Sequence, residues 1–418
     1  MSKYNFKFVD LFAGIGGFHQ AMADLGGTCV MSCEINDKCR ATYSANFTNT
    51  DLRGDINDID PKTIPDFDVL CAGFPCQPFS KAGHQKGFHD PERGNLFYKI
   101  MDILDVHPEV KFVILENVKN LADKSENWEI ITSELGKRNF FITESPVILS
   151  PSNFGIAQLR QRVYILGLRK DIRNEKILKN GCIHIKDLRL ETEYKKCQLW
   201  DYRGLLETNV SVDYIVKPEI ELMICAWDEF RINTGIKLIG FPIWISCFGL
   251  DVDDEEESRR ILEYDLMPKW KQNYYRKNRE LYLNNKEFID KWISKYDMLH
   301  RIKLFQKFEW NCGNDIFDMH NTIIQVRQSG IRVKRPTFFP SLVAMTNTPI
   351  IWDNNFQHYR YITPREAANQ QNFWRTFKFI GDDNTIYHQL GNAVNVRVLK
   401  ILAEHLFKLA QKNWRVNE

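Results

Sequence analysis

The chain is 418 residues long, which allows a large domain with a smaller one, and its 44% hydrophobic and 26% charged side chains are typical of a soluble globular protein. The formal net charge is only +2, so the overall charge does not by itself indicate a nucleic-acid-binding protein. No apolar run is long enough to cross a membrane, and the N-terminus lacks the apolar core of a signal peptide. We therefore expect a cytoplasmic protein without a membrane partner.

The ten cysteines do not have the spacing of a disulfide-rich secreted domain, and no CxxC pair occurs among them. Cys29, Cys33 and Cys39 lie close together, but their spacing is not that of zinc ligands. We expect reduced thiols, most of them buried, and no metal site.

In the first 170 residues, apolar segments that read as buried strands alternate with segments of helical periodicity. The expected strands are residues 6–12, 28–33, 68–72, 112–115 and 163–168. Helices are expected after the glycines that follow the first strand, and over 96–106. Alternation of this kind is typical of an α/β fold, in which helices cover both faces of a parallel sheet.

The alternation fades after about Lys170, where the chain becomes richer in Trp, Tyr, Asn and Lys, and it returns after Tyr361. Val394, Val398, Ile401, Leu402 and Leu409 predict an amphipathic final helix. We therefore predict a discontinuous first domain, 1–180 and 357–418, that is interrupted by an inserted domain, 181–356.

A glycine-rich turn, AGIGG, follows the first strand, and Glu34 follows the second. Glycines let the backbone turn tightly and approach a ligand at a helix N-terminus, and an acid twenty residues later can bind ribose hydroxyls. The spacing is not the GxGxxG of dinucleotide sites. The pattern favours a nucleotide-like cofactor, although glycine turns also occur without a ligand.

Cys76 and Glu116 each lie where a strand ends, and ligands bind at strand ends in α/β sheets. Cys76, flanked by Pro75 and Pro78, is a candidate nucleophile or a buried inert thiol. Burial should favour the protonated form of Glu116, which could then donate a proton to a ring nitrogen; its alternative is a turn cap.

Two arginines in QLRQR, Arg160 and Arg162, are spaced to share one face of an extended segment. They could bind a phosphate, a pyrimidine carbonyl or a carboxylate, or form a surface ion pair.

Positive charge is concentrated in two parts of the expected insertion. Residues 269–307 hold eleven Lys and Arg against four Asp and Glu. Residues 325–335 contain no acid and hold Arg327, Arg332, Lys334 and Arg335. Such runs are candidate DNA-binding surfaces or ordinary solvated faces. The aromatic residues Trp270, Tyr274, Trp292 and Phe305 are predicted to belong to the core rather than to stack on bases.

Taken in order, these motifs resemble those of the cytosine-5 DNA methyltransferase family of the bacterial restriction-modification type. The resemblance covers about Phe8–Leu168 and Gln325–Leu406. Its blocks are the glycine turn, Glu34, GDI at 54–56, GFPCQPFS at 73–80, ENVKN at 116–120, QLRQR at 158–162, TPREAANQQNF at 363–373 and HQLGNAV at 388–394.

The resemblance implies a Rossmann-like domain that binds S-adenosylmethionine and an inserted target-recognition domain. The implied cofactor-binding residues are Phe12, Gly14, Gly16, Gly17, Glu34, Asp55, Ile56, Pro75, Leu96, Asn392 and Val394. The implied catalytic residues are Cys76, Glu116, Arg160 and Arg162. The expected DNA contacts are Gln77, Ser80, Arg93, Arg327, Arg332, Lys334 and Arg335.

The implied reaction is methyl transfer to carbon 5 of a cytosine flipped out of duplex DNA, through a covalent Cys76 adduct. A functional pairing with a restriction endonuclease and a monomeric state are also implied. The alternatives are a tRNA cytosine methyltransferase, a catalytically silent DNA-binding homologue and an unrelated nucleotide-binding oxidoreductase. The large insertion favours DNA.

Two positions depart from the family pattern. Ser341 stands where relatives often have threonine, which keeps the hydroxyl and loses a methyl group. Asn372 stands where glycine is usual, and asparagine tolerates a left-handed backbone better than most residues. We expect a turn at Asn372 to be preserved.

Overall fold

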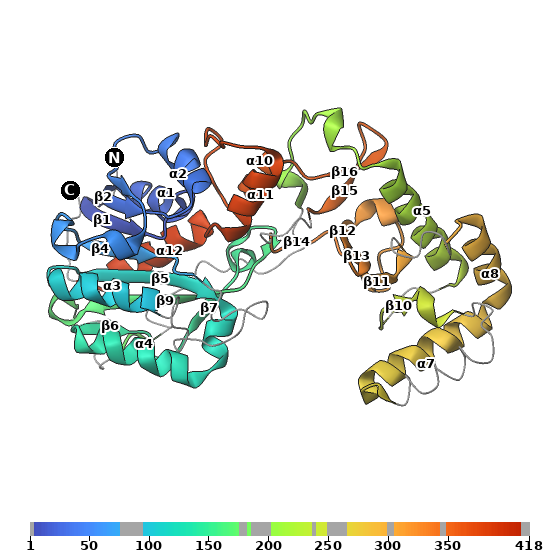
Figure 1. The fold of residues 1–418 in the computed structure, drawn as a ribbon, viewed down its shortest axis with the longest axis horizontal. Coiled ribbons are helices and arrows are strands. Elements are labelled where there is room, and N and C mark those ends of the chain that lie inside the picture. The colour runs from blue at the N-terminus through green and yellow to red at the C-terminus, as the bar shows by residue number, and fades with distance from the viewer. Residues whose placement is uncertain are drawn as a thin grey trace. The chain divides into compact units, whose positions relative to one another are not determined.

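The computed structural model describes residues 4–75, 95–174, 182–184, 202–235, 240–248, 266–298, 305–342 and 348–410. The chain divides into two compact units (Figure 1). Unit 1 comprises Met1–Leu206, Pro340–Thr346 and Pro364–Glu418, and unit 2 comprises Glu207–Phe339 and Asn347–Thr363. Among the described residues, no helix has the length and apolarity that a membrane crossing requires.

Unit 1 is built on an eight-stranded sheet in the order β3-β2-β1-β4-β5-β9-β6, with β7 paired to β9. Its five leading strands are parallel: β1 (Phe6–Leu11), β2 (Gly27–Cys33), β3 (Leu52–Arg53), β4 (Val69–Ala72) and β5 (Phe112–Val118). The strands β6 (Phe140–Ile142), β7 (Val147–Leu149) and β9 (Arg162–Arg169) complete it, and β9 runs antiparallel to β5. The expected α/β fold is observed, with this antiparallel addition.

The strands of unit 1 are buried on both faces. Phe407 in α12 (Val396–Phe407) packs against Phe6 and Phe112, with ring centroids 5.2 and 4.7 Å away. The same face also carries α1 (Gly17–Ala23). The alternate residues Val9 and Leu11 belong to the core that includes α3 (Asn95–Val106) and α4 (Ser125–Lys137). The remaining helices of the unit are α2 (Asp37–Ser44), α10 (Pro364–Gln370) and α11 (Asp383–Asn392).

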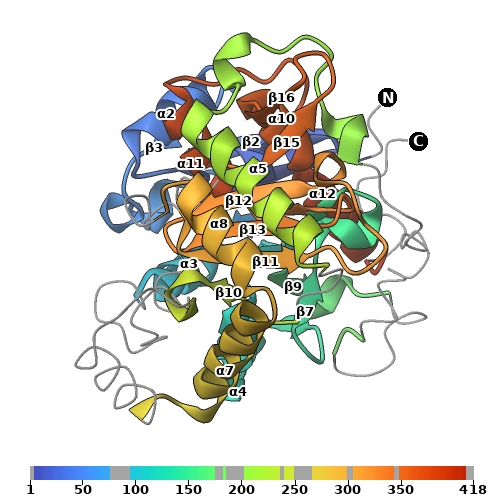
Figure 2. The same ribbon diagram turned by 90° about the vertical axis from the view of Figure 1, so that its right-hand side faces the viewer.

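Unit 2 contains a six-stranded sheet in the order β10-β11-β13-β12-β15-β16. The strands are β10 (Ile243–Trp244), β11 (Lys307–Asn311), β12 (Ile323–Arg327), β13 (Gly330–Lys334), β15 (Ile350–Asp353) and β16 (His358–Tyr361). Figure 2 shows α5 (Pro218–Asn233) and α8 (Lys286–Lys295) lying across these strands, with α7 (Lys269–Asn284) beside them. Trp227, Trp292 and Phe308 meet in the core between helices and sheet.

Unit 2 ends later in the chain than the predicted insertion, 181–356. The hairpin of β15 and β16 continues its sheet, since Ile350 pairs with Ile324 in β12. Unit 2 therefore begins at Glu207 and ends at Thr363, although the short segment Pro340–Thr346 within this range belongs to unit 1. Of the aromatic residues predicted to be core, Trp292 and Phe305 are buried, but the prediction was wrong for Trp270, whose side chain is exposed on the first turn of α7.

Candidate active site

Several of the predicted site residues lie at one edge of the unit 1 sheet. Because β1, β2, β4 and β5 are parallel, the loops that follow them meet at their common carboxyl edge. The strand order reverses between β1 and β4, and ligands bind in the crevice at such a switch point. The glycine turn, Glu34 and Pro75 follow three of these strands, and Glu116 lies near the end of the fourth.

The turn after β1 uses backbone conformations that favour glycine. Gly14 has φ +56° and Gly16 has φ +91°. A Cβ atom on Gly16 would lie 2.3 Å from the Phe47 ring, so this position excludes a side chain. A Cβ atom on Gly14 would meet nothing within 4 Å. Open space therefore lies beside Gly14, and Phe12, at φ +56°, holds the start of the same turn.

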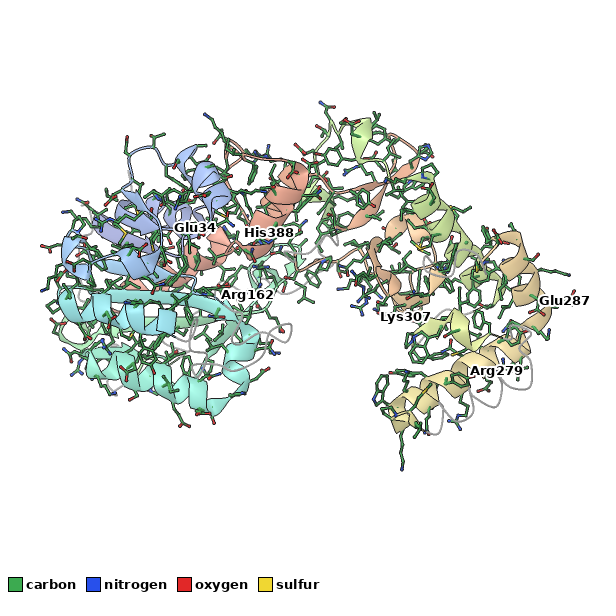
Figure 3. The ribbon with its side chains drawn as sticks, viewed as in Figure 1. Glu34, Arg162, Arg279, Glu287, Lys307 and His388 are labelled. Atoms are coloured by element: carbon green, nitrogen blue, oxygen red, sulfur yellow. The ribbon has the colours of Figure 1, made fainter. Side chains whose placement is uncertain are left out.

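Glu34 connects the turn after β1 to the loop after β2 (Figure 3). Its Oε2 accepts a hydrogen bond of 2.8 Å from the Gly14 backbone N–H, and its Oε1 accepts one of 2.8 Å from Asn36. Each carboxylate oxygen keeps a second lone pair, which could accept a hydroxyl proton. This geometry fixes a half-exposed acid beside the open space at Gly14.

The other predicted cofactor contacts come from separate segments. Val394 lies against the turn, because a Cβ atom on Gly17 would be 2.6 Å from its Cγ2. Asp55 accepts a hydrogen bond of 2.9 Å from the Asn57 backbone N–H, which caps the short helix that starts at Ile56. Exposure differs among the remaining positions: Ile56 is buried, Pro75 and Leu96 are half-buried, and Asn392 is exposed.

Glu116 forms an ion pair with Arg162, with 3.0 Å between Oε1 and Nε. The pair forms because β5 and β9 are antiparallel, and Val118 stands opposite Arg162. Burial raises the pKa of Glu116, although the charges of Arg162 and Arg160 act in the opposite direction. This direction agrees with the predicted preference for the protonated form.

The Glu116 carboxyl group also lies next to the segment that leads to Cys76. A Cβ atom on Gly73 would be 3.9 Å from Glu116 Oε2, and Asn117 donates a hydrogen bond of 3.2 Å to the Phe74 carbonyl oxygen. Cys76 itself, and the predicted DNA contacts Gln77, Ser80 and Arg93, lie outside the described residues.

Arg160 and Arg162 have different surroundings, although their spacing had predicted one shared face. Arg160 is buried, and its guanidinium donates to the carbonyl oxygens of Leu342, Gly391 and Ala393, each at 2.9 Å. It also donates to the Ser341 hydroxyl group at 3.2 Å. Arg160 thus joins three distant segments of unit 1, whereas Arg162, which is labelled in Figure 3, forms the ion pair with Glu116.

Both departures from the family pattern are accommodated. The Ser341 hydroxyl group accepts from Arg160 and donates to the Leu342 carbonyl oxygen at 3.2 Å. Asn372 has φ +60°, so the left-handed turn predicted there is present. The Gln20 side chain donates to the Asn372 carbonyl oxygen at 3.0 Å, which fixes this turn against α1.

In unit 2, alternation along the strands puts Lys307, Glu309, Arg327, Arg332 and Lys334 on one face of the sheet, which we call the basic face. Lys307 and Arg327 flank Gly330, and Glu309 stands beside Arg332 in the next row. The opposite face carries core residues such as Phe308, Ile331 and Val333. The basic face therefore has four cations and one carboxylate, a local excess of +3.

Glu309 organises the cations of the basic face. It pairs with Lys307 at 2.6 Å, with Arg327 at 3.2 Å and with Arg332. Although burial opposes the shift, hydrogen bonds from Arg332 and Lys307 lower the pKa of Glu309 to about 2. The sequence had not singled out Glu309 or Lys307; the alternation of KFEWN, 307–311, was the available signal.

The other predicted DNA contacts in unit 2 have different partners. Arg335 pairs with Asp315, with both contacts at 2.5 Å, and donates to the Cys312 carbonyl oxygen. Within the basic stretch 269–307, Lys286 and Lys291 pair with acids one turn away on α8, and Lys295 pairs with Glu229. Ion pairs of this kind are typical of solvated helix faces. In Figure 3, the labelled residue Arg279 lies on α7 and Glu287 lies on α8.

The fold is that of a class of protein, the S-adenosylmethionine-dependent methyltransferases. The structure is similar to that of S. pombe Dnmt2 methyltransferase, with a TM-score of 0.57 at 16% identity, covering 97% of this chain and 98% of that one. It is also similar to the structure of a Spodoptera frugiperda DNMT2 mutant, with a TM-score of 0.54 at 19% identity, covering 96% of this chain and 99% of that one. At these identities, the similarity shows the fold.

The chain belongs to the C-5 cytosine-specific DNA methylase family, whose model matches residues 6–408. It is similar to the type II methyltransferase M.AluI of Cellulosimicrobium cellulans, with 31% identity over 97% of this chain and 93% of the relative. It is also similar to the type II methyltransferase M.HgiCI of Herpetosiphon aurantiacus, with 33% identity over 97% of this chain and 98% of the relative. The chain is accordingly a DNA (cytosine-5)-methyltransferase that uses S-adenosylmethionine as the methyl donor.

Proposed function

We propose that this enzyme methylates cytosine within a specific duplex sequence through a covalent adduct on Cys76, with Glu116 as the acid that engages the base. The observation that carries the proposal is the position of Glu116. It is a buried carboxyl group with a raised pKa, beside the segment that leads to Cys76 and paired with Arg162.

The cofactor site is proposed at the carboxyl edge of the unit 1 sheet. The open space at Gly14, beside the Glu34 carboxylate and the turn from Phe12 to Gly17, is proposed to take the ribose. Asp55, Ile56, Pro75, Leu96, Asn392 and Val394 are proposed to complete it. When bound, S-adenosylmethionine supplies an electrophilic methyl group.

The protein's own groups make cytosine able to accept that methyl group. The Cys76 thiolate adds to carbon 6 of the ring, while Glu116 hydrogen-bonds ring nitrogen 3 and the exocyclic amine. The addition makes carbon 6 tetrahedral and shifts the electrons of the 5,6 double bond to carbons 4 and 5, while ring nitrogen 3 takes the proton of Glu116. The resulting enamine at carbons 4 and 5 makes carbon 5 nucleophilic. After carbon 5 is methylated, it loses its proton, and expulsion of Cys76 restores the aromatic ring.

The two arginines are proposed to have different roles. Arg162 holds and orients the Glu116 carboxyl group, and Arg160 positions the backbone around Gly391 and Ala393 without touching the base. In unit 2, Arg327, Arg332 and Lys334 are proposed to contact DNA phosphates together with Lys307. Arg335 is left out of this set because Asp315 already neutralises it.

Because M.AluI and M.HgiCI are named type II methyltransferases, we propose that the modification protects DNA from a cognate restriction endonuclease. The endonuclease would be a functional companion and not a bound subunit, and the methyltransferase would act as a monomer in the cytoplasm.

The proposal is tested by nucleoside mass spectrometry after DNA, and in parallel tRNA, is incubated with the protein and S-adenosylmethionine that carries a heavy methyl group. Labelled 5-methyldeoxycytidine is expected. Labelled N4-methylcytosine or N6-methyladenine would contradict the Cys76 mechanism. Label on tRNA alone would support the RNA alternative, and no label on either would support a silent homologue.

Gly14→Ala is expected to weaken S-adenosylmethionine binding by about tenfold or more. Alanine is disfavoured at φ +56° by about 1–2 kcal/mol, and its methyl group would point into the open space proposed for the cofactor. Isothermal titration calorimetry measures the effect. Gly136→Ala in α4, where a Cβ atom also meets nothing within 4 Å, is the matched control and should bind normally. Normal binding by Gly14→Ala would contradict the site.

The raised pKa of Glu116 predicts a pH-dependent stability difference for Glu116→Gln. A carboxyl group whose pKa is higher in the folded than in the unfolded state stabilises the fold fully below its unfolded pKa, and this contribution is lost as pH rises through the folded pKa. The Tm of the variant should therefore rise relative to that of wild type between pH 5 and pH 8. The expected rise is about 2–4 °C for each kcal/mol of folding stability that wild type loses as Glu116 ionises.

Glu134→Gln is the control for this measurement, because hydrogen bonds from Lys137 and Arg138 lower the pKa of Glu134. Its contribution to stability is lost only at pH values below this window, so its Tm difference from wild type should stay flat. A flat profile for Glu116→Gln as well would show that Glu116 is ionised throughout the window, and would remove its proposed role as the acid.

A further inference from the structure

Asn311 continues the basic face into a third row. It follows Glu309 by two residues on β11, so its side chain points to the same side of the sheet, and it stands in register with Lys334 on β13. Asn311 is exposed. Within the parts of the chain that the structure describes, its side-chain amide makes no hydrogen bond, so both its donor and its acceptor are available to a ligand.

A pocket of about 400 Å³ opens next to Asn311. Its lining includes Phe241, Pro242 and Trp310 as apolar walls and Glu309 and Asn311 as polar ones. Glu309 already accepts from Lys307, Arg327 and Arg332, which leaves Asn311 as the polar side chain with unused hydrogen-bonding groups. The pocket thus places an uncommitted amide at the border of a surface that attracts phosphates.

We propose that Asn311 is a specificity-determining residue, which reads the edge of an adenine in the target sequence while the cations of the basic face hold the adjacent phosphates. This inference rests on the proposed DNA-binding function of unit 2. Phosphate contacts position a protein on DNA without reading its sequence, and base-edge contacts supply the specificity. An asparagine amide matches adenine, because it donates to N7 and accepts from the N6 amine at the same time.

The basic face and Asn311 together supply the two kinds of group that sequence recognition needs, which are cations for the phosphates and an amide for the base edge. Lys307, Arg332 and Lys334 are long cationic side chains on the same face, and Glu309 holds Arg332 in place in the absence of DNA. Asn311 is uncharged, so its replacement should leave the electrostatic attraction unchanged. Replacing Asn311 should therefore change the base preference, whereas replacing one of the cations should change the affinity and its dependence on salt.

The experiment begins with the wild-type protein, unmethylated plasmid DNA and bisulfite sequencing, which gives the preference for each base around the methylated cytosine. Asn311→Ala is then mapped in the same way. It is expected to relax the preference at one A·T pair and to lower kcat/KM on the wild-type site by about 5- to 150-fold. Asn311→Leu, which keeps roughly the same size and loses both the donor and the acceptor without adding charge, should do the same.

Lys334→Gln is expected to lower DNA affinity for every sequence alike and to reduce the slope of log K against log salt by about 1, with unchanged base preference. Lys291→Gln is the matched control, because Lys291 pairs with Glu287 on the solvated face of α8; its affinity, salt slope and preference should match wild type. Asn311→Ala should keep the wild-type salt slope.

A chemical substitution in the DNA isolates the proposed contact. Replacing the recognised adenine by 7-deazaadenine removes the N7 acceptor, so it should weaken binding of the wild-type protein but have no further effect on Asn311→Ala. Equal losses for both proteins would overturn the assignment, as would an Asn311→Ala variant that keeps every base preference. Absence of 5-methylcytosine with the wild-type protein would instead contradict the proposed function, so the two failures are distinguishable.

Discussion

Replacing Cys76 by alanine is expected to lower the rate of DNA methylation by about 10⁴-fold or more, which is the scale seen when a covalent nucleophile is removed. Without the thiolate, nothing adds to carbon 6, and carbon 5 stays too electron-poor to attack a methyl group. Binding of S-adenosylmethionine should be unchanged, because Cys76 is not among the residues proposed to hold it and the substitution leaves Glu34 and the glycine turn intact. Single-turnover methylation and calorimetric cofactor binding measure the two effects.

The covalent step itself can be trapped. DNA with 5-fluorocytosine at the target carries fluorine where a proton must leave, so the Cys76 adduct cannot resolve after methylation. The wild-type protein should remain attached to this DNA on a denaturing gel, and Cys76→Ala should not. Cys225→Ser, at an exposed cysteine of α5, is the control and should still form the adduct. An adduct that survives Cys76→Ala would assign the nucleophile elsewhere.

Arg160→Ala is expected to destabilise unit 1 by about 3–5 kcal/mol, because the carbonyl oxygens of Leu342, Gly391 and Ala393 and the Ser341 hydroxyl group all lose the hydrogen bond that Arg160 donates. Even Arg160→Lys should lose most of this stability, since an ammonium group has three donors and lacks the planar fork of a guanidinium. Urea unfolding measured by far-UV circular dichroism gives the free energy of unfolding.

Arg162 provides the comparison. Arg162→Ala removes a single ion-pair partner from Glu116 and should cost less stability than Arg160→Ala, but it should lower kcat strongly in protein that remains folded. Arg160→Ala could instead keep the wild-type free energy of unfolding and lose only activity. Arg160 would then be a base contact, as its place in QLRQR had suggested, and not a positioning residue.

Much of the cofactor side of the site could be predicted from local sequence. A strand, a glycine turn and an acid after the next strand specify a geometry over a few tens of residues, and Glu34 indeed accepts from the Gly14 backbone N–H at 2.8 Å. The turn at Asn372 was predictable for the same reason, since its backbone preference is a property of the residue itself.

Other parts depend on residues that are far apart in the chain. Glu309 pairs with Arg327 and Arg332, 18 and 23 residues later, and only the strand order β11-β13-β12 brings the three together. Counting charges had pointed to Arg327 and Arg332 but not to Glu309. It had also pointed to residues 269–307 as a whole, where Lys286 and Lys291 belong to ion pairs within α8.

The sequence by itself determined the family, the reaction and the parallel α/β core, because each is recorded in short motifs whose chemistry depends on local spacing. Tertiary structure decided the division of labour between Arg160 and Arg162. Arg160 reaches acceptors up to 233 residues away, and Arg162 meets Glu116 across an antiparallel strand pair. Two arginines in one motif look alike in sequence, and their roles separate only when burial and the available acceptors are fixed by packing.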